Sequence, residues 1–143
     1  MKRIAFALAL FLVLAATSFA AGLLLTQRRV RRAVEHLREE HLTSTEPGSY
    51  RARATTSVAE IARLGCRALP ALMDELDPEL SPYYLCRVAD CLSDVSEGDA
   101  PRVVFTDDAD QKRRSVDLLR AWWLTRGRER HRWWRFWSAR CVQ

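Results

Sequence analysis

The chain has 143 residues, of which 48% are hydrophobic and 29% are charged. This length is enough for one globular domain once the N-terminus is set aside, and the mixture excludes an intrinsically disordered chain. Five glycines and five prolines are too few for the turns of a β-sandwich, so the composition predicts an all-α domain.

The net charge of +5 conceals a change of sign along the chain. Residues 1–59 carry nine basic and four acidic side chains, residues 60–110 carry four and twelve, and residues 111–143 carry ten and two. The acidic middle and the basic C-terminal part either attract each other within one fold or each face a partner of their own.

The N-terminus carries an uncharged, mostly apolar run, Ile4–Leu25, which follows two basic residues. As a helix, these 22 residues would extend about 33 Å and would span the core of a bilayer. Four arginines follow the run, at positions 28, 29, 31 and 32. We predict a signal anchor over residues 1–27, a juxtamembrane helix and linker over 28–55, and a helical domain over 56–143.

A cleaved signal peptide is the alternative, because Ser18-Phe19-Ala20 offers small residues to a signal peptidase. Cleavage near Ala20 would give a secreted or periplasmic product with three leucines near its new N-terminus, so the sequence favours the anchor. The arginines after the run argue for a cytoplasmic domain by the positive-inside rule, whereas the signal-like N-terminus argues for export. We expect an extracytoplasmic domain.

The domain sequence predicts three short helices and then one or two longer ones. Ser57 and Glu60 form a capping box, and Gly65 ends the first helix, whose inward residues would be Val58, Ile61, Ala62 and Leu64. The second helix has Pro70 near its first turn and places Leu69, Leu72, Met73 and Leu76 on one face. The third begins with Ser81 as a cap and Pro82, and its apolar stripe is Tyr84, Val88, Cys91, Leu92 and Val95.

A loop over residues 96–106, with a short extended piece at 103–105, leads to a helix that Thr106 caps and Gly127 ends. A final helix is expected from residue 128 to about residue 139. Trp122, Trp133 and Trp137, together with Val116 and Leu119, are expected to cover the edge of the helical stack.

The segment 57–95 resembles HEAT-like helical repeats, through a short apolar helix, a glycine, the stretch "CRALPALMDELDPE" and a further amphipathic helix. The resemblance extends over one and a half repeats at most, and no second copy follows at a period of 35 to 45 residues. It implies a small stack of four to five helices that binds a partner and does not catalyse a reaction.

No local motif for catalysis or metal binding stands out. His36 and His41 are five positions apart, whereas a zinc-protease helix needs histidines four apart. Asp107, Asp108 and Asp110 are interpreted as N-terminal helix caps and not as a metal site. We therefore expect no cofactor, no metal and no enzymatic activity.

The four cysteines, Cys66, Cys86, Cys91 and Cys141, allow two disulfides or buried free thiols. Cys86 and Cys91 lie about 140° apart around a helix, so we do not expect them to bond to each other. The absence of a CxxC spacing gives a zinc site little support.

The segment 126–137, "RGRERHRWWRFW", combines arginine and tryptophan, the residues that a bilayer interface prefers. It either closes the helical stack or binds a membrane surface or another anionic partner; nucleic acid is not expected for an exported domain. The candidate binding residues are Arg126, Arg128, Arg130, Arg132, Trp133, Trp134, Arg135 and Trp137.

The sequence therefore predicts a non-catalytic, membrane-tethered scaffold that mediates protein–protein interaction. The first alternative is a protein that binds the membrane surface, or another anionic partner, through its Arg/Trp-rich tail. The second is an exported enzyme of a type that the sequence does not reveal.

Overall fold

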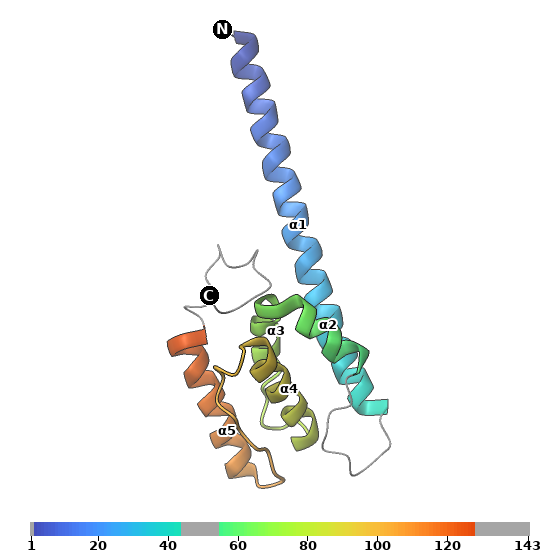
Figure 1. Ribbon diagram of the computed structural model, residues 1–143, viewed down its shortest axis with the longest axis vertical. Coiled ribbons are helices and arrows are strands. Elements are labelled where there is room, and N and C mark those ends of the chain that lie inside the picture. Colours follow the sequence, from blue (N-terminus) through green and yellow to red (C-terminus); the bar gives the residue numbers. More distant parts are fainter. Residues whose placement is uncertain (1, 44–54, 128–143) are drawn as a thin grey trace.

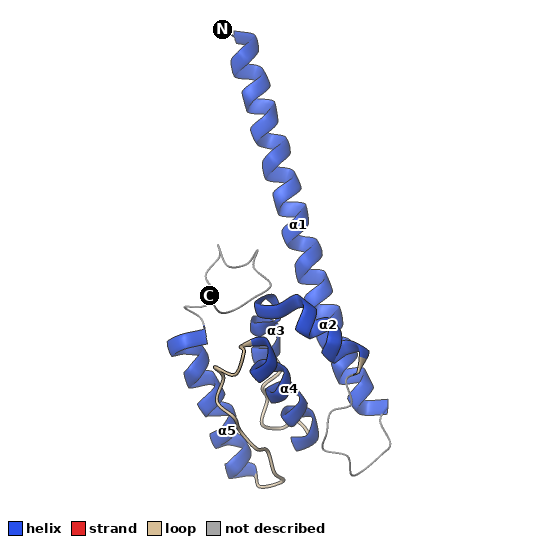
Figure 2. Ribbon diagram, in the orientation of Figure 1, coloured by secondary structure: helices blue, strands red, loops and turns tan. Residues whose placement is uncertain are grey.

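A single helix, α1 (Lys2–Thr43), begins the chain and projects far beyond the rest of the molecule (Figure 1). The structure, a computed structural model, describes residues 2–43 and 55–127. The other elements are α2 (Thr56–Leu64), the 3-10 turn η1 (Gly65–Ala68), α3 (Leu69–Asp74), α4 (Pro82–Val95), α5 (Ala109–Trp122) and the π-helical turn η2 (Trp123–Gly127). The described residues contain helices and loops but no strand (Figure 2), which confirms the all-α prediction.

Most of the described apolar side chains between Leu10 and Leu25 of α1 are exposed. Phe11 is 70% exposed and Leu12 is 66% exposed, and Leu24 and Leu25 near the end of the apolar run are exposed as well. The helix is long and apolar enough to cross a membrane, by length and composition. Exposed apolar surface on this scale needs an apolar environment.

The C-terminal part of α1 belongs to the core of the domain. Val30, Ala33, Val34 and Leu37 are buried, and Ala33 and Leu37 have no exposed surface. Their i, i+3, i+4, i+7 spacing places them on one face of the helix. The sequence assigns residues 28–55 to a segment before the domain, but packing makes α1 one of the helices of the domain.

Two hydrogen bonds join the end of α1 to the start of α2. The Ser57 hydroxyl donates to the Glu40 carboxylate, and the Ser57 amide donates to the other carboxylate oxygen at 3.4 Å. The predicted capping box at Ser57 is wrong, because Thr55 is the N-cap and accepts from the Val58 amide. Ser57 is buried, and it takes the stronger, charged acceptor that α1 offers.

The second and third predicted helices are confirmed in their apolar faces. Leu69, Leu72, Met73 and Leu76 are buried, and so are the five residues of the predicted α4 stripe. Gly65 ends α2 with a φ of 58°, and Pro70 and Pro82 lie in the first turns of α3 and α4. Two details differ: Ala62 is exposed, and the Ser81 hydroxyl makes no capping hydrogen bond.

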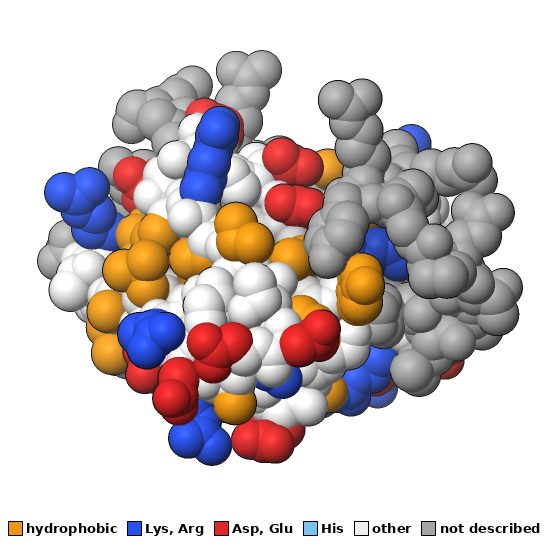
Figure 3. Space-filling model, turned by 90° about the horizontal axis from the view of Figure 1, so that it is seen from below, with side chains coloured by type: hydrophobic (Ala, Val, Ile, Leu, Met, Phe, Trp, Pro, Cys, Tyr) orange, Lys and Arg blue, Asp and Glu red, His pale blue; other side chains and the backbone are white. Residues whose placement is uncertain are grey.

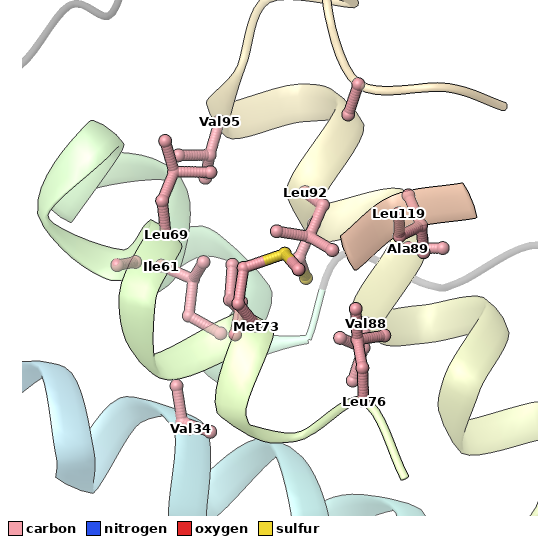
Figure 4. Packing of buried hydrophobic residues seen from close by; sticks show 14 of the residues in the cluster. Val34, Ile61, Leu69, Met73, Leu76, Val88, Ala89, Leu92, Val95 and Leu119 are labelled. Carbon is pink, nitrogen blue, oxygen red and sulfur yellow. The ribbon is translucent and has the colours of Figure 1, made fainter. Parts of the chain in front are cut away.

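The helices alternate in direction. Figure 1 shows α2 running back along α1, α3 descending, α4 ascending, and the loop 96–108 returning to the start of α5, which ascends again. Side chains from all five α-helices meet in one core, among them Val34, Ile61, Met73, Leu92 and Leu119 (Figure 4). The HEAT-like kinship of the segment 57–95 stays a prediction.

The helix α5 begins differently from the prediction. Asp108, and not Thr106, is its N-cap, and it accepts from the amides of Asp110 and Gln111 at 2.9 and 3.4 Å. The Thr106 hydroxyl donates instead to the Gln111 side chain at 3.1 Å. Phe105 of the preceding loop is buried. The N-cap lies two residues later than the capping pattern predicts.

We expect Glu40→Gln to lower the free energy of unfolding by roughly 1–3 kcal/mol, because a charged acceptor is replaced at a partly buried hydrogen bond. Chemical denaturation in detergent, followed by circular dichroism, measures this change. Glu35→Gln, at an exposed position of the same helix, is the matched control and should leave stability unchanged. Equal effects of the two substitutions would contradict the role of Glu40.

Candidate membrane-facing site

One end of the domain faces the apolar part of α1, and α5 ends there (Figure 1). We call this the membrane-facing end, because the helix that is long and apolar enough to cross a membrane projects from it; it comprises the end of α2, η1, the end of α4 and η2. Long side chains fix α5 against the loop after α3, since Arg120 donates to the Leu76 carbonyl at 2.7 Å and Lys112 to the Leu80 carbonyl at 3.4 Å. The direction in which α5 leaves the domain is therefore set by tertiary contacts.

Trp122 fastens the last turn of α5 at this end. Its side chain is 7% exposed, and its indole nitrogen donates to an Asp99 carboxylate oxygen at 3.1 Å. The neighbouring Trp123 ring lies 6.3 Å away, centroid to centroid, and is tilted by 46°. Of the residues expected to cover the edge of the stack, Val116, Leu119 and Trp122 are buried, whereas Trp133 and Trp137 lie outside the described residues.

Beyond Trp122 the helix widens into the π-helical turn η2. The Thr125 hydroxyl donates to the carbonyls of Ala121 and Trp122 at 2.9 and 3.2 Å. This turn leaves Leu124 65% exposed and Arg126 exposed. An exposed leucine beside an exposed arginine suits a surface that is apolar on one side and anionic on the other.

Basic side chains gather near the same end. Arg28, Arg29, Arg31 and Arg32 of α1 are exposed. At 100° per residue, Arg28, Arg31 and Arg32 point away from the face that buries Ala33 and Leu37, whereas Arg29 lies only about 40° from Ala33, at the edge of that face. Arg63 and Arg67 lie at the end of α2 and in η1, whereas Asp94 and Glu97 near the end of α4 are the exposed acidic side chains in this part of the described chain.

Of the predicted binding residues, the structure describes Arg126 alone. Arg128, Arg130, Arg132, Trp133, Trp134, Arg135 and Trp137, and the predicted helix 128–139, lie outside the described residues. The described part shows where the segment starts: at the membrane-facing end, next to the exposed Leu124. Sequence reasoning missed Arg63 and Arg67, because nothing in their local pattern places them at the same end as Arg126.

The described thiols do not form a reactive site. Cys86 and Cys91 are free, and the Cys86 thiol lies 3.9 Å from the Phe105 carbonyl oxygen. Burial raises the pKa of the Cys91 thiol to about 12, and the neighbouring Asp94 and Asp90 carboxylates add to the rise. At neutral pH Cys91 is therefore a protonated core residue and a poor nucleophile. Cys66, by contrast, is disulfide-bonded.

The predicted N-terminal acids have a structural role. Asp108 caps α5, while Asp107 and Asp110 are exposed beside it. No group of three or more His, Cys, Asp or Glu residues with the arrangement of a metal site occurs within residues 2–43 and 55–127. His36 is exposed on α1, and His41 carries no described side chain.

One partly buried polar cluster joins three helices at the opposite, membrane-distal end. The Tyr84 hydroxyl donates to the Glu75 carboxylate at 2.6 Å, and Arg38 Nε lies 3.7 Å from the same carboxylate oxygen. Burial, and then the Glu75 carboxylate, raise the pKa of Tyr84 above its usual range. The cluster therefore links α1, the end of α3 and α4, and its Tyr84 hydroxyl stays protonated at neutral pH.

Neither a family model, nor a characterised protein, nor a solved structure matches this chain. Evidence on what the membrane-facing end binds therefore comes from the geometry of the chain itself.

We expect Trp122→Phe and Asp99→Ala to be coupled, because each removes one partner of the same hydrogen bond. Unfolding of both single variants and the double variant gives the coupling free energy, which should be roughly 1–2 kcal/mol for a bond to a charged acceptor. Val104→Ala, which truncates an exposed loop side chain, should combine additively with either substitution. Additivity of Trp122→Phe and Asp99→Ala would contradict the contact.

Proposed function

We propose that the protein is a membrane-anchored, non-catalytic helical scaffold, which stands directly on the bilayer and binds a protein partner at the end that faces away from it. The observation that carries this proposal is the unbroken helix α1, in which the apolar run and the buried residues Ala33 and Leu37 belong to one rod. No flexible joint separates the anchor from the domain. The position of the domain over the membrane is therefore fixed by the helix.

The spacing along α1 supports close contact with the bilayer. Five residues separate Leu25, at the end of the apolar run, from Val30, the first buried residue. At about 1.5 Å per residue this corresponds to roughly 7–8 Å, similar to the thickness of one headgroup layer. The membrane-facing end of the domain would then lie against the headgroups.

The membrane-distal end carries a different charge. Asp74, Asp77, Glu79, Asp107, Asp108 and Asp110 are exposed there, in the loop after α3 and at the start of α5. Figure 3, which looks at this end, shows acidic side chains with basic and apolar ones between them. Of the basic residues nearby, Arg38 contacts Glu75 and Lys112 donates to the Leu80 carbonyl, whereas Arg113 and Arg114 of α5 are exposed. A protein partner with a basic patch would complement this acidic distal face.

A second candidate function is binding of the membrane surface by the basic, tryptophan-rich tail. It is favoured by the direction of α5, because η2 delivers the chain to the membrane-facing end with Leu124 and Arg126 exposed. Arginine pairs with lipid phosphates and tryptophan prefers the headgroup layer. The two functions are compatible, since they use opposite ends of the domain.

We further propose that the domain lies on the extracytoplasmic side of the membrane. The disulfide at Cys66 supports this orientation, because disulfides persist in oxidising compartments and are rare in the cytosol. The anchor is proposed to stay attached. Cleavage near Ala20 would leave the core residues of α1 in place, because these begin at Val30.

We expect the double substitution Leu12→Arg and Val13→Arg to release the protein from membranes, because each arginine at the centre of a span costs roughly 2.5–3.5 kcal/mol. Alkaline carbonate extraction of isolated membranes measures the release. Leu118→Arg, at an exposed leucine of α5, is the matched control and should remain in the pellet. Release of the wild-type protein would contradict the anchor, as would a mature N-terminus near Ala20.

We expect a photo-crosslinking side chain at position 74 or 79, in the acidic distal face, to give a discrete protein adduct in intact membranes. The same side chain at position 94, an exposed aspartate of α4 near the membrane-facing end, is the control and should not give that adduct. Substituting the distal acids by lysine should abolish the adduct, since the partner surface is expected to be basic. Equal adducts from all three positions would contradict a specific protein contact.

A further inference from the structure

Exposed arginines from two different helices gather beyond the end of the apolar run. The end of α1 and the start of α2 are joined by the hydrogen bond from the Ser57 hydroxyl to Glu40, and the two helices run in opposite directions (Figure 1). Six residues after Ser57, Arg63 therefore lies at the level of α1 position 34, six residues before Glu40. Arg32 is two residues nearer to the apolar run, a difference of about 3 Å along the helix axis.

These two arginines lie on the same open face of the α1–α2 pair. In α1, Arg32 lies about 140–160° around the helix from the buried Leu37 and Val30. In α2, Arg63 lies about 160° around the helix from the buried Ile61. Both arginine side chains are exposed. Each helix therefore turns its arginine away from the core that the two helices share.

Arg29 extends the cluster toward the apolar run. It lies eleven residues before Glu40, so it points to within about 20° of the direction in which Glu40 meets α2. Its side chain is exposed. It follows Leu25, the end of the apolar run, by four residues, which is about 6 Å along the axis. A headgroup layer is about 5–7 Å thick, so Arg29 lies at the depth of the headgroups.

We propose that Arg29, Arg32 and Arg63 form a site that binds the phosphate groups of anionic lipids of the membrane in which α1 is anchored. The inference rests on the proposed anchoring. It differs from the second candidate function, because the site is built on α1 and α2 and does not include the tryptophan-rich tail.

The three arginines have no anionic partner within residues 2–43 and 55–127. No ion pair joins them to a carboxylate there, and the nearby acids of the two helices, Glu35 and Glu60, lie farther from the apolar run. A guanidinium group binds phosphate through two parallel hydrogen bonds. Lipid phosphates would therefore supply the negative charge that the cluster lacks.

Arg63 lies deepest in the domain but still within the field of the headgroups. The level of position 34 is nine residues beyond Leu25, which corresponds to about 13–14 Å. This places Arg63 less than one Debye length, about 8 Å, beyond the headgroup layer. Tertiary structure thus adds a charge from α2 to the arginines that follow the span in the sequence.

Spin-labelled lipids test the site with the full-length protein reconstituted in phosphatidylcholine vesicles. Electron paramagnetic resonance gives the fraction of labelled lipid held at the protein, for labelled phosphatidylglycerol and for labelled phosphatidylcholine. We expect a preference for phosphatidylglycerol. Arg32→Gln and Arg63→Gln should each lower this preference roughly two- to fivefold, because one basic residue near an anionic surface contributes up to about a factor of five.

Arg113→Gln, at an exposed arginine near the start of α5, removes the same charge at the opposite end and is the matched control. It should leave the preference unchanged, and Arg63→Lys should retain most of it. Equal binding of the two lipids by the wild-type protein would overturn the site. Equal effects of Arg63→Gln and Arg113→Gln would do the same, and so would an effect of Arg32→Gln with none of Arg63→Gln.

Replacing chloride by inorganic phosphate at constant ionic strength distinguishes lipid phosphate from free phosphate. A lipid site should keep its preference for phosphatidylglycerol, whereas loss of that preference would identify a soluble anion as the occupant and overturn the proposal. Carbonate extraction does not depend on these arginines, so failure of the anchor is detected independently of failure of the lipid site.

Discussion

The structure depends on one helix, α1, whose first part is an exposed apolar segment and whose second part is buried in the core of the domain. Most described side chains of the apolar run of α1 are exposed, and about two to three turns after the end of that run the same helix buries Ala33 and Leu37 in the domain core. A helix cannot bend sharply without a break in its hydrogen bonds. The apolar run and the domain therefore have a fixed relative orientation, and removal of the second half of α1 would remove part of the core.

A few polar contacts fix the positions of the other helices relative to α1. Glu40 fixes the start of α2 to the end of α1, and Glu75 joins Arg38 to Tyr84 at the distal end. Arg120 and Trp122 then fix α5, whose last turn points back toward the anchor. Each of these contacts bridges segments far apart in the sequence. Together they place the arginines of α1, α2 and η2 at one end and most loop acids at the other.

Apolar periodicity predicted the helices well because it is a local property. The stripes of α3 and α4 were predicted correctly down to single residues, Gly65 marked the end of α2, and Pro82 marked the start of α4. Capping was predicted less well. Ser57, Ser81 and Thr106 have the side chains of N-caps, but Ser57 bonds to a carboxylate from another helix, and Asp108 takes the place of Thr106. A cap competes with every acceptor that folding brings near it, and local sequence does not reveal those acceptors.

The candidate site also combines residues that local sequence identified with residues that only the tertiary structure brought to the same end. Arg126 was identified from its local sequence composition. Arg63 and Arg67 were identified only from the structure, in which the antiparallel order of the helices places the end of α2, η1 and η2 at the same end of the domain (Figure 1). The disulfide at Cys66 is a further example. The spacing of the cysteines left every pairing possible, whereas the structure shows that Cys86 and Cys91 are free thiols.

The sequence by itself determined the all-α class, the apolar N-terminal run and the apolar faces of α3 and α4, since these follow from composition and from helical periods within short windows. Tertiary structure decided that α1 enters the core, which hydroxyls cap helices, and which end of the domain faces the apolar run. These depend on the directions in which helices pack, and such directions arise from contacts between residues that are distant in the chain.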